Sequence, residues 1–254
     1  NTVRKYLRGE KDLPRYKARA PRPGKLDAFK PYLQGRIAAA RPHWIPATVL
    51  MREIQAQGYA DAGKYVFPLK VKSKQPANGN SFKGATISKE VIHNFWKDTA
   101  FNIGLATGEV NNLVVVDVDD EQIWAKFSAD HGGLPQGPKV ITGKGHHLYF
   151  AYPKGRRIRN KHEPGNGFDI RANGGYVVAP PSIHHSGKVY KFTNTGEPPE
   201  LPEWLLELIA EPEKSANTTL NFTAPIPAAS DSTPWAMAGL AGECQTIAST
   251  TEGS

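Results

Sequence analysis

The sequence reads Val114-Val115-Val116-Asp117-Val118-Asp119-Asp120 at the point where its fold is most plainly encoded. Three β-branched residues predict a strand that leads into two carboxylates at alternate positions. Since side chains alternate along a strand, we expect Asp117 and Asp119 on one face and Val118 in the core. Asp120 then stands where it can cap the helix that follows.

The carboxylate pair has two interpretations. A rise of about 3.3 Å per residue places the two Cα atoms about 6–7 Å apart, so that the side chains could share divalent metal ions. Two metal ions held by carboxylates serve phosphoryl chemistry. The alternative is a strand end whose aspartates only cap the next helix, and the pair alone leaves both open.

Short strands and helices continue on both sides of this stretch. Ser88 is the expected N-cap of a helix, and we interpret 102–106 and 113–119 as a hairpin joined by the turn 107–112. This order predicts an α+β domain with a mainly antiparallel sheet and flanking helices. The expected strands are 65–69, 102–106, 113–119, 139–142, 147–152, 167–171 and 176–179, and the expected helices are 88–97, 121–131 and 202–209.

The segments on either side of this domain differ from it in composition, so we expect the chain to have three parts. Residues 1–59 form a basic segment with helices near 1–8, 32–40 and 46–57, the last ended by Gly58, and a Pro- and Arg-rich linker over 10–31. Residues 64–209 form the main domain. Residues 212–254 are expected to be a linker to 233 and the start of a helical module. Since the chain lacks an initial methionine and a closing element, we take it as a fragment.

Positive charge is concentrated near the N-terminus. The chain carries a net charge of +8, and residues 1–60 alone hold thirteen Lys/Arg against four Asp/Glu. That surplus predicts contacts with DNA phosphates. The alternative is a solvated basic face or a disordered tail. The residues predicted to contact DNA are Arg4, Lys5, Arg8, Arg19 and Arg22.

Composition excludes several other classes of protein. No apolar run reaches the length of a membrane span, and the polar, basic first residues do not form a secretory signal. The single cysteine, Cys244, excludes an internal disulfide and a Cys-rich zinc site. It suits a reducing cytoplasm, which is the expected location.

A second candidate motif is the glycine-rich turn in Thr142-Gly143-Lys144-Gly145-His146-His147-Leu148-Tyr149-Phe150. Such a turn lets backbone N–H groups and the Lys144 cation approach a triphosphate, and His147 enters the next strand on the same face as Tyr149. It is not a Walker A loop, because Gly145 stands where Ser or Thr is required. Taken alone, the stretch equally fits an ordinary hairpin.

A third candidate motif spans residues 167–182. Asp169 and Arg171 share one face of a predicted strand, and Asn173-Gly174-Gly175 supplies a turn. The acid and the guanidinium could form only a surface ion pair. Alternatively, Asp169 is a third metal ligand and Arg171 clamps a phosphate.

Taken together and in order, these motifs resemble the bifunctional primase-polymerase domain of phages, plasmids and integrated elements, a branch of the archaeo-eukaryotic primase superfamily. The resemblance covers about 145 of the 254 residues and departs from the family only before His147, where the turn is shorter. It implies that Asp117, Asp119 and Asp169 hold two divalent ions, Mg²⁺ or Mn²⁺, and that His147 contacts the incoming triphosphate. The matching segments are 66–69, 102–108, the 117/119 strand, 147–150, 169–182 and 201–205.

The resemblance further implies a template-directed nucleotidyltransferase that acts on a DNA template with NTPs or dNTPs. A replicative helicase, fused or separate, is an expected partner. To His147 we add Arg171, Lys144 and Ser182 as nucleotide-binding residues. The rivals are a metal-dependent nuclease, which also uses clustered acids, and a catalytically inactive DNA-binding module of replication or transposition.

Residues 1–59 resemble a different protein, the N-terminal DNA-binding part of an insertion-sequence transposase. The resemblance lies in residues 1–7, the Pro/Arg linker, and the segments 25–27, 31–33 and 44–48. It implies that residues 1–7 are the recognition helix of a helix-turn-helix whose first helix is missing.

Overall fold

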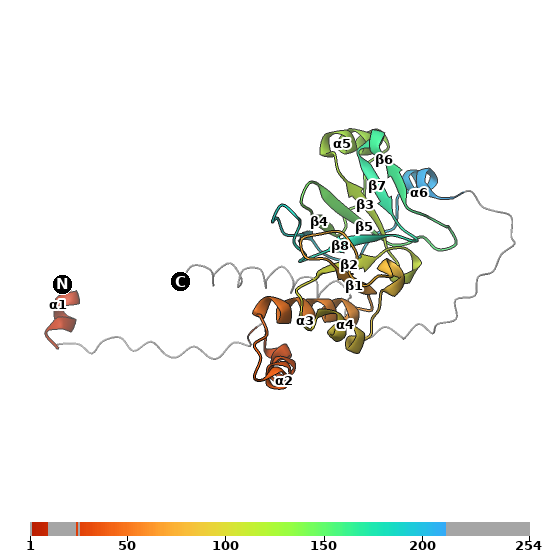
Figure 1. Cartoon of the computed structure of the whole chain (residues 1–254). Coiled ribbons are helices and arrows are strands. Elements are labelled where there is room, and N and C mark those ends of the chain that lie inside the picture. Colours follow the sequence, from red (N-terminus) through yellow and green to blue (C-terminus); the bar gives the residue numbers. More distant parts are fainter. Residues whose placement is uncertain (1, 10–23, 25, 212–254) are drawn as a thin grey trace.

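The computed structural model describes residues 2–9, 24 and 26–211 (Figure 1). The expected linker after residue 211 and the helical module at 234–248 lie outside these residues, as do Arg19 and Arg22. None of the described helices is both long and apolar enough to cross a membrane.

Two antiparallel sheets form the centre of the molecule, which confirms the predicted α+β class. The larger sheet has the strand order β6-β7-β3-β5-β4-β9, and the smaller has the order β1-β2-β8. The strands are β1 (Val66–Leu69), β2 (Asn102–Ala106), β3 (Val114–Val118), β4 (Lys139–Ile141), β5 (His146–Phe150), β6 (Lys161–Glu163), β7 (Phe168–Arg171), β8 (Tyr176–Ala179) and β9 (Lys191–Asn194).

Helices cover the outer faces of both sheets, and two of them begin at the predicted N-caps. Ser88 accepts a hydrogen bond from the backbone N–H of Val91 at 3.4 Å, and Asp120 accepts from those of Gln122 and Ile123 at 3.0 Å. The helices are α1 (Thr2–Leu7), α2 (Lys30–Ala40), α3 (Ala47–Asp61), α4 (Lys89–Trp96), α5 (Glu121–Asp130) and α6 (Glu203–Ile209), with short 3-10 turns at Asp27–Phe29, Ser81–Gly84, Glu109–Asn111 and Pro164–Asn166.

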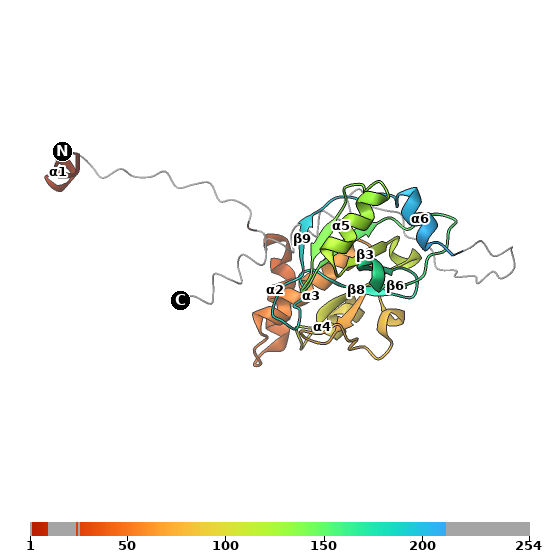
Figure 2. The same ribbon diagram turned by 90° about the horizontal axis from the view of Figure 1, so that it is seen from above.

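The alternation of β3 divides the core into two layers. Val114, Val116 and Val118 pack in one cluster with residues of α5 and α6, and Val115 packs in the other with the small sheet, α3 and α4. Figure 2 shows α5 and α6 on the opposite side of the molecule from α3 and α4. Asp117 shares the face of Val115 and therefore points into the space between the two sheets.

The predicted hairpin of 102–106 and 113–119 is wrong. β2 pairs with β1 and β8, whereas β3 pairs with β5 and β7 in the other sheet. Asn111 turns the chain between the sheets, because its buried side chain bonds the backbone of Tyr65 and the carbonyl of Ala106. The connection therefore leads from one sheet to the other instead of folding back.

The predicted end of a helix at Gly58 is also wrong, because α3 continues to Asp61. The apolar face continues through Tyr59 and Ala60, which are buried in the core, and the Tyr59 hydroxyl donates to the Pro180 carbonyl at 2.8 Å. Gly63 instead follows the helix, with a φ of 68° that favours glycine. The packed body thus begins before the boundary expected at residue 64.

A buried carboxylate ties α2 to this body. The side chain of Glu53 on α3 is fully buried and accepts hydrogen bonds from Tyr32 and Arg36 of α2 and from His93 of α4. Arg36 also donates to the carbonyl of Lys97 at 3.0 Å. Helices from the expected segment 1–59 are therefore held to the main domain by hydrogen bonds.

Short polar strands and one helix face were not predicted correctly. β6 and β9 were not predicted because both strands are short and consist mostly of polar residues. The helical spacing of Val91, Ile92, Phe95 and Trp96 predicts one buried face. Val91 is nevertheless 38% exposed, whereas Ile92 and Trp96 are fully buried. The contacts of α3 and β1, and not the helical period alone, decide which face of α4 is buried.

Replacing Glu53 tests the attachment of α2. Glu53→Ala should lower the free energy of unfolding by about 3–5 kcal/mol, because it leaves buried donors without their acceptor. The exposed Glu90 on α4 is the matched control, and Glu90→Ala should cost at most about 1 kcal/mol. Urea unfolding monitored by circular dichroism measures both. Equal stability of the two variants would contradict the buried network.

Candidate active site

Four side chains line up across four neighbouring strands. The pairing places His162 of β6 opposite Asp169 of β7, Asp169 opposite Asp117 of β3, and Asp117 opposite His147 of β5. Residues directly opposite each other in an antiparallel pair have neighbouring side chains on one face. We call these four residues the acid row, since two carboxylates form its centre and a histidine stands at each end.

Each carboxylate of the acid row is bonded to donors. Nε2 of His147 lies 3.3 Å from Oδ1 of Asp117, and Nδ1 of His162 bonds Oδ1 of Asp169. The guanidinium of Arg171 donates to Oδ2 of Asp169 at 2.8 Å and lies 4.0 Å from Oδ2 of Asp117. Arg171 thus bridges the two acids and offsets their mutual repulsion.

The environment of Asp117 keeps its carboxylate ionised. Burial opposes ionisation, but the hydrogen bond from His147 and the attraction of His147, Lys74 and Arg171 outweigh it, so the pKa of Asp117 lies below its usual value. Burial, together with the charges of Asp117 and Asp119, raises the pKa of Tyr190 to about 12. The site therefore combines a buried anion with cations and a neutral phenol.

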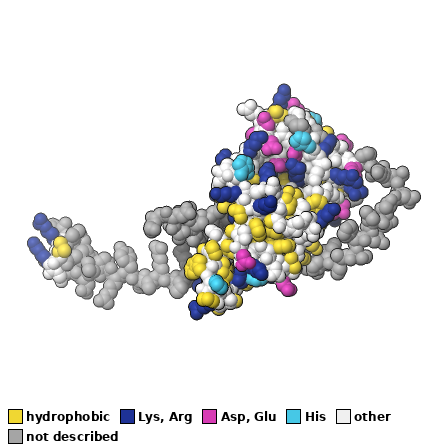
Figure 3. Space-filling model, viewed as in Figure 1, with side chains coloured by type: hydrophobic (Ala, Val, Ile, Leu, Met, Phe, Trp, Pro, Cys, Tyr) yellow, Lys and Arg dark blue, Asp and Glu magenta, His cyan; other side chains and the backbone are white. Residues whose placement is uncertain are grey.

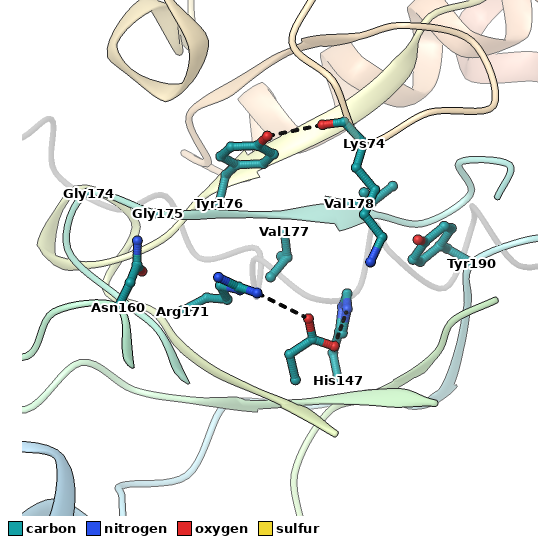
Figure 4. A pocket seen from close by; sticks show the side chains of 11 residues that line it. Lys74, His147, Asn160, Arg171, Gly174, Gly175, Tyr176, Val177, Val178 and Tyr190 are labelled. Carbon is teal, nitrogen blue, oxygen red and sulfur yellow. Dashed lines mark hydrogen bonds and ion pairs between the residues drawn. The ribbon is translucent and has the colours of Figure 1, made fainter. Parts of the chain in front are cut away.

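A pocket of about 220 Å³ opens between the two sheets above the acid row (Figure 4). Asp117, His147 and Arg171 line it from the large sheet, and β8 forms the facing wall. The side chain of Lys74 points into the pocket toward His147, while its carbonyl accepts from the Tyr176 hydroxyl at 3.0 Å. The remaining lining residues are Asn160, Gly174, Gly175, Tyr176, Val177, Val178 and Tyr190.

Asp119 and Lys144 lie near one another at the end of β3. Nζ of Lys144 is 3.9 Å from Oδ1 of Asp119, and both side chains are largely exposed. Gly145 allows this arrangement, because a Cβ there would meet the Val118 carbonyl oxygen at 1.8 Å. Of the three predicted carboxylates only Asp117 lines the pocket. Asp169 stands directly opposite Asp117 in the paired strands, whereas Asp119 is largely exposed beyond the end of β3.

Other predicted binding residues lie away from the pocket. Ser182 is fully buried, and its hydroxyl accepts from the N–H of Ile103 at 2.8 Å, so its placement does not support contact with a nucleotide. Arg4, Lys5 and Arg8 are exposed on or directly after α1, which leaves their predicted contact with DNA open.

The pair Asp117 and Asp169 fits a divalent cation in chemistry and charge. Mg²⁺ and Mn²⁺ prefer carboxylate oxygens, and each oxygen keeps acceptor capacity beyond the one hydrogen bond described above. Within residues 2–9, 24 and 26–211, however, no group of three or more His, Cys, Asp or Glu side chains could hold a metal ion. Binding through Asp119 as well would require its side chain to move.

Several pocket or row residues were not singled out from the sequence. Tyr176 and Gly175 lie inside the third motif, so the motif itself carried a signal. Lys74, Asn160, His162 and Tyr190 come from loops or short strands whose positions depend on tertiary pairing. Lys161-His162-Glu163 has no alternation of apolar and polar residues, so no local pattern predicts a strand there.

Comparison with known proteins identifies one family. The profile described as "Bifunctional DNA primase/polymerase, N-terminal" matches residues 56–204, more than half of the chain. The match contains the acid row and every residue of the pocket. It does not reach residues 1–55 and lends no support to the transposase resemblance. No curated protein matches the chain.

Titration of Asp117 tests the electrostatics of the row. In His147→Ala the carboxylate loses a hydrogen bond and an attractive charge, so its pKa should rise toward or above the usual value of about 3.9. Because the folded pKa is depressed, ionised Asp117 stabilises the native state above about pH 3.9, and this is lost as pH falls through the folded pKa.

Carboxyl ¹³C NMR titration measures the pKa of Asp117 directly. His131→Ala is the control and should leave Asp117 unchanged, since the His131 ring bonds the Phe127 carbonyl on α5 and packs beside Trp204, away from the acid row. An unchanged pKa in His147→Ala would show that His147 does not hold Asp117 in its ionised form.

Proposed function

Since the chain belongs to the bifunctional DNA primase/polymerase family, we propose that it is a template-directed nucleotidyltransferase that makes primers or extends DNA. The observation that carries the proposal is the acid row, where Asp117 and Asp169 stand side by side beneath a pocket lined by cations. The replication of a phage, plasmid or integrated element is the proposed setting.

In the proposed reaction a 3′-hydroxyl attacks the α-phosphorus of a bound nucleoside triphosphate. A bond forms between the 3′-oxygen and phosphorus, the bond to the bridging oxygen breaks, pyrophosphate leaves, and the hydroxyl proton passes to solvent. Asp117 and Asp169, with Asp119 if its side chain turns inward, would hold Mg²⁺ or Mn²⁺. A bound divalent ion supplies positive charge that activates the hydroxyl and stabilises the leaving group.

The cations of the pocket have a role in binding the triphosphate. Arg171 offers a planar fork of donors that suits phosphate oxygens, and Lys74 adds a point charge that points into the pocket. Nδ1 of His147 is buried and has no hydrogen-bond partner within the described part of the chain, so one position remains for a ligand. Fixed donors of this kind stabilise the charge that develops during phosphoryl transfer.

The wall opposite the acid row suits the nucleoside. Tyr176 packs edge-on against Phe67, with ring centroids 5.1 Å apart, and its hydroxyl is held by the Lys74 carbonyl. A ring fixed at both ends provides a rigid surface for a sugar or base. Beside it, Gly174 and Gly175 line the pocket, and the side chain of Asn160 packs against Gly175.

A metal-dependent nuclease is the rival enzyme, because clustered acids serve hydrolysis as well. A catalytically inactive DNA-binding module is the non-enzymatic rival. Both are tested by following a labelled primer on a template with each nucleotide type and each metal ion. Template-dependent lengthening supports the proposal, shortening supports the nuclease, and no change supports the inactive module.

Substitution of the acid row assigns the activity to this site. Asp117→Asn and Asp169→Asn should each lower the rate of primer extension by at least about a hundredfold, because each removes a charge from the reacting centre at similar volume. Asp130→Asn, at the exposed end of α5, is the control and should retain the wild-type rate. Extension at the wild-type rate by Asp117→Asn would refute the assignment.

Removal of residues 1–25 tests the proposed DNA-binding role of the basic N-terminus and keeps α2 and α3 in place. The shortened chain should retain its single-turnover rate at saturating template but bind duplex DNA more weakly. Its dependence of log affinity on log salt should be shallower by about 0.9 per lost phosphate contact. A large loss of rate at saturating DNA would mean that these residues belong to the catalytic machinery.

A further inference from the structure

The cations of a basic stretch in the middle of the chain have no role in the site described so far. Between β5 and β6 the sequence reads Lys154-Gly155-Arg156-Arg157-Ile158-Arg159-Asn160-Lys161-His162, with five Lys/Arg and no acid. We call residues 154–162 the basic ribbon. The net charge of the chain does not reveal this stretch, because residues 61–254 together are nearly neutral.

The backbone of the basic ribbon is anchored to the core. Ile158 is fully buried, its N–H donates to the Tyr152 hydroxyl at 2.9 Å, and its carbonyl accepts from the N–H of Asn173 at 3.2 Å. An anchored backbone holds the neighbouring cations at fixed places on the surface, and less side-chain and backbone freedom is lost when they bind a partner.

Arg157 and Arg159 of the ribbon carry more positive charge than their shared partner Glu211 neutralises. Glu211 pairs with Arg159 at 2.8 Å and with Arg157 at 3.7 Å, while Lys161 donates to the Leu208 carbonyl at 3.2 Å. One carboxylate thus faces two guanidinium groups. The exposed cations of the ribbon are Lys154, Arg157, Arg159 and Lys161. In Figure 3 Lys and Arg gather on the part of the surface formed by the large sheet.

The ribbon leads directly to the acid row. β6 is the last strand of the large sheet, beside β7, and His162 bonds Asp169 from this edge. Asn160 lines the pocket, while Arg157, Arg159 and Lys161 turn toward Glu211 and α6, which lie on the other face of the large sheet. A chain of phosphates that leaves the pocket and bends round the edge strand β6 would pass from His162 to these cations.

The geometry of phosphoryl transfer separates the two ends of the acid row. The attacking and leaving oxygens lie roughly in line on opposite sides of the reacting phosphorus. Lys74 and His147, which the proposed function assigns to the triphosphate and its leaving pyrophosphate, lie with Tyr190 at one end of the acid row. Arg171, which also serves the triphosphate, lies between the two ends, because it contacts both Asp117 and Asp169. The attacking 3′-hydroxyl must then approach from the other end, where His162 stands.

We propose that the basic ribbon binds the backbone phosphates of the strand that is extended, and that His162 positions Asp169 beside the 3′-end of that strand. The proposal rests on the proposed function for the direction of the nucleotide. In this proposal the His147 end of the acid row serves the nucleoside triphosphate, and the His162 end serves the strand that is extended. Nucleic acid is the partner that fits, because a dense row of phosphates attracts a fixed row of cations regardless of sequence.

Charge removal in the full chain tests the ribbon. The test variant is Lys154→Gln/Arg157→Gln/Lys161→Gln, which leaves Arg159 paired with Glu211. The matched control is Lys83→Gln/Lys97→Gln/Lys126→Gln, which removes the same charge at exposed positions outside the pocket. Fluorescence anisotropy with a labelled primer–template hairpin, at several salt concentrations, measures the affinity of each.

The ribbon variant should bind the hairpin at least about tenfold more weakly, with a salt slope lowered by about 2–3, as expected for three lost phosphate contacts. The control should lose less than about twofold. Equal losses in both variants, or no loss in either, would overturn the proposal. Inorganic tripolyphosphate should bind wild type and ribbon variant equally, and a selective loss of its binding would show that the ribbon holds the nucleotide instead.

Steady-state extension tests the role of His162. His162→Ala should raise the KM for primer at least about fivefold and leave the nucleotide affinity within about twofold of wild type. His162→Asn should recover part of the loss, because the amide still donates to Asp169. An equal effect on both substrates, or no recovery with asparagine, would show that His162 has no positioning role on the primer side.

These outcomes are distinguishable from failure of the proposed function. If wild type extends primers but the ribbon variant binds and extends like the control, the function stands and the ribbon proposal fails. If wild type incorporates no nucleotide, the proposed function fails, and with it the assignment of the two ends of the row.

Discussion

The pairing of β3 with β5 on one side and β7 on the other is the constraint on which the rest of the site depends. β3 is buried on both faces, so its valines must enter both core clusters at once. A slip of one residue in either pairing would send Asp117 into the apolar layer under α5. The register that buries the valines is therefore also the register that assembles the acid row.

Two neighbouring carboxylates between packed sheets are unfavourable unless cations and donors surround them. Arg171 bridges Asp117 and Asp169, and a histidine bonds each acid from the outer side. These partners come from three different strands, and two of them, His147 and Arg171, keep the Asp117 carboxylate ionised in the absence of substrate. The same charges can be offered to phosphates, so the groups that stabilise the empty pocket are those that the proposed reaction uses.

The family match and the packing of the helices agree on where the domain begins. The match begins at residue 56, within α3, and α3 contributes Ala56, Tyr59 and Ala60 to the core. The buried Glu53 then extends that body to α2 through Tyr32 and Arg36. Segment 26–61 is thus physically part of the domain, even though its charge and composition set it apart in the sequence.

Local sequence patterns by themselves determined many of the secondary-structure elements of this protein and its family. The valine run, the Ser88 and Asp120 caps and the alternation of Asp169 and Arg171 encode elements whose residues are close in the chain, and the ordered motifs identified the family. The sequence could not decide that β2 and β3 belong to different sheets, that α3 passes Gly58, or that His162 and Lys74 meet Asp169 and Asp117. Those outcomes depend on strand register and on burial between segments that are distant in the chain. Contacts of that kind produce no hydrophobic periodicity in the local sequence, so local patterns do not predict them. Only the tertiary structure therefore decided which side chains share the pocket.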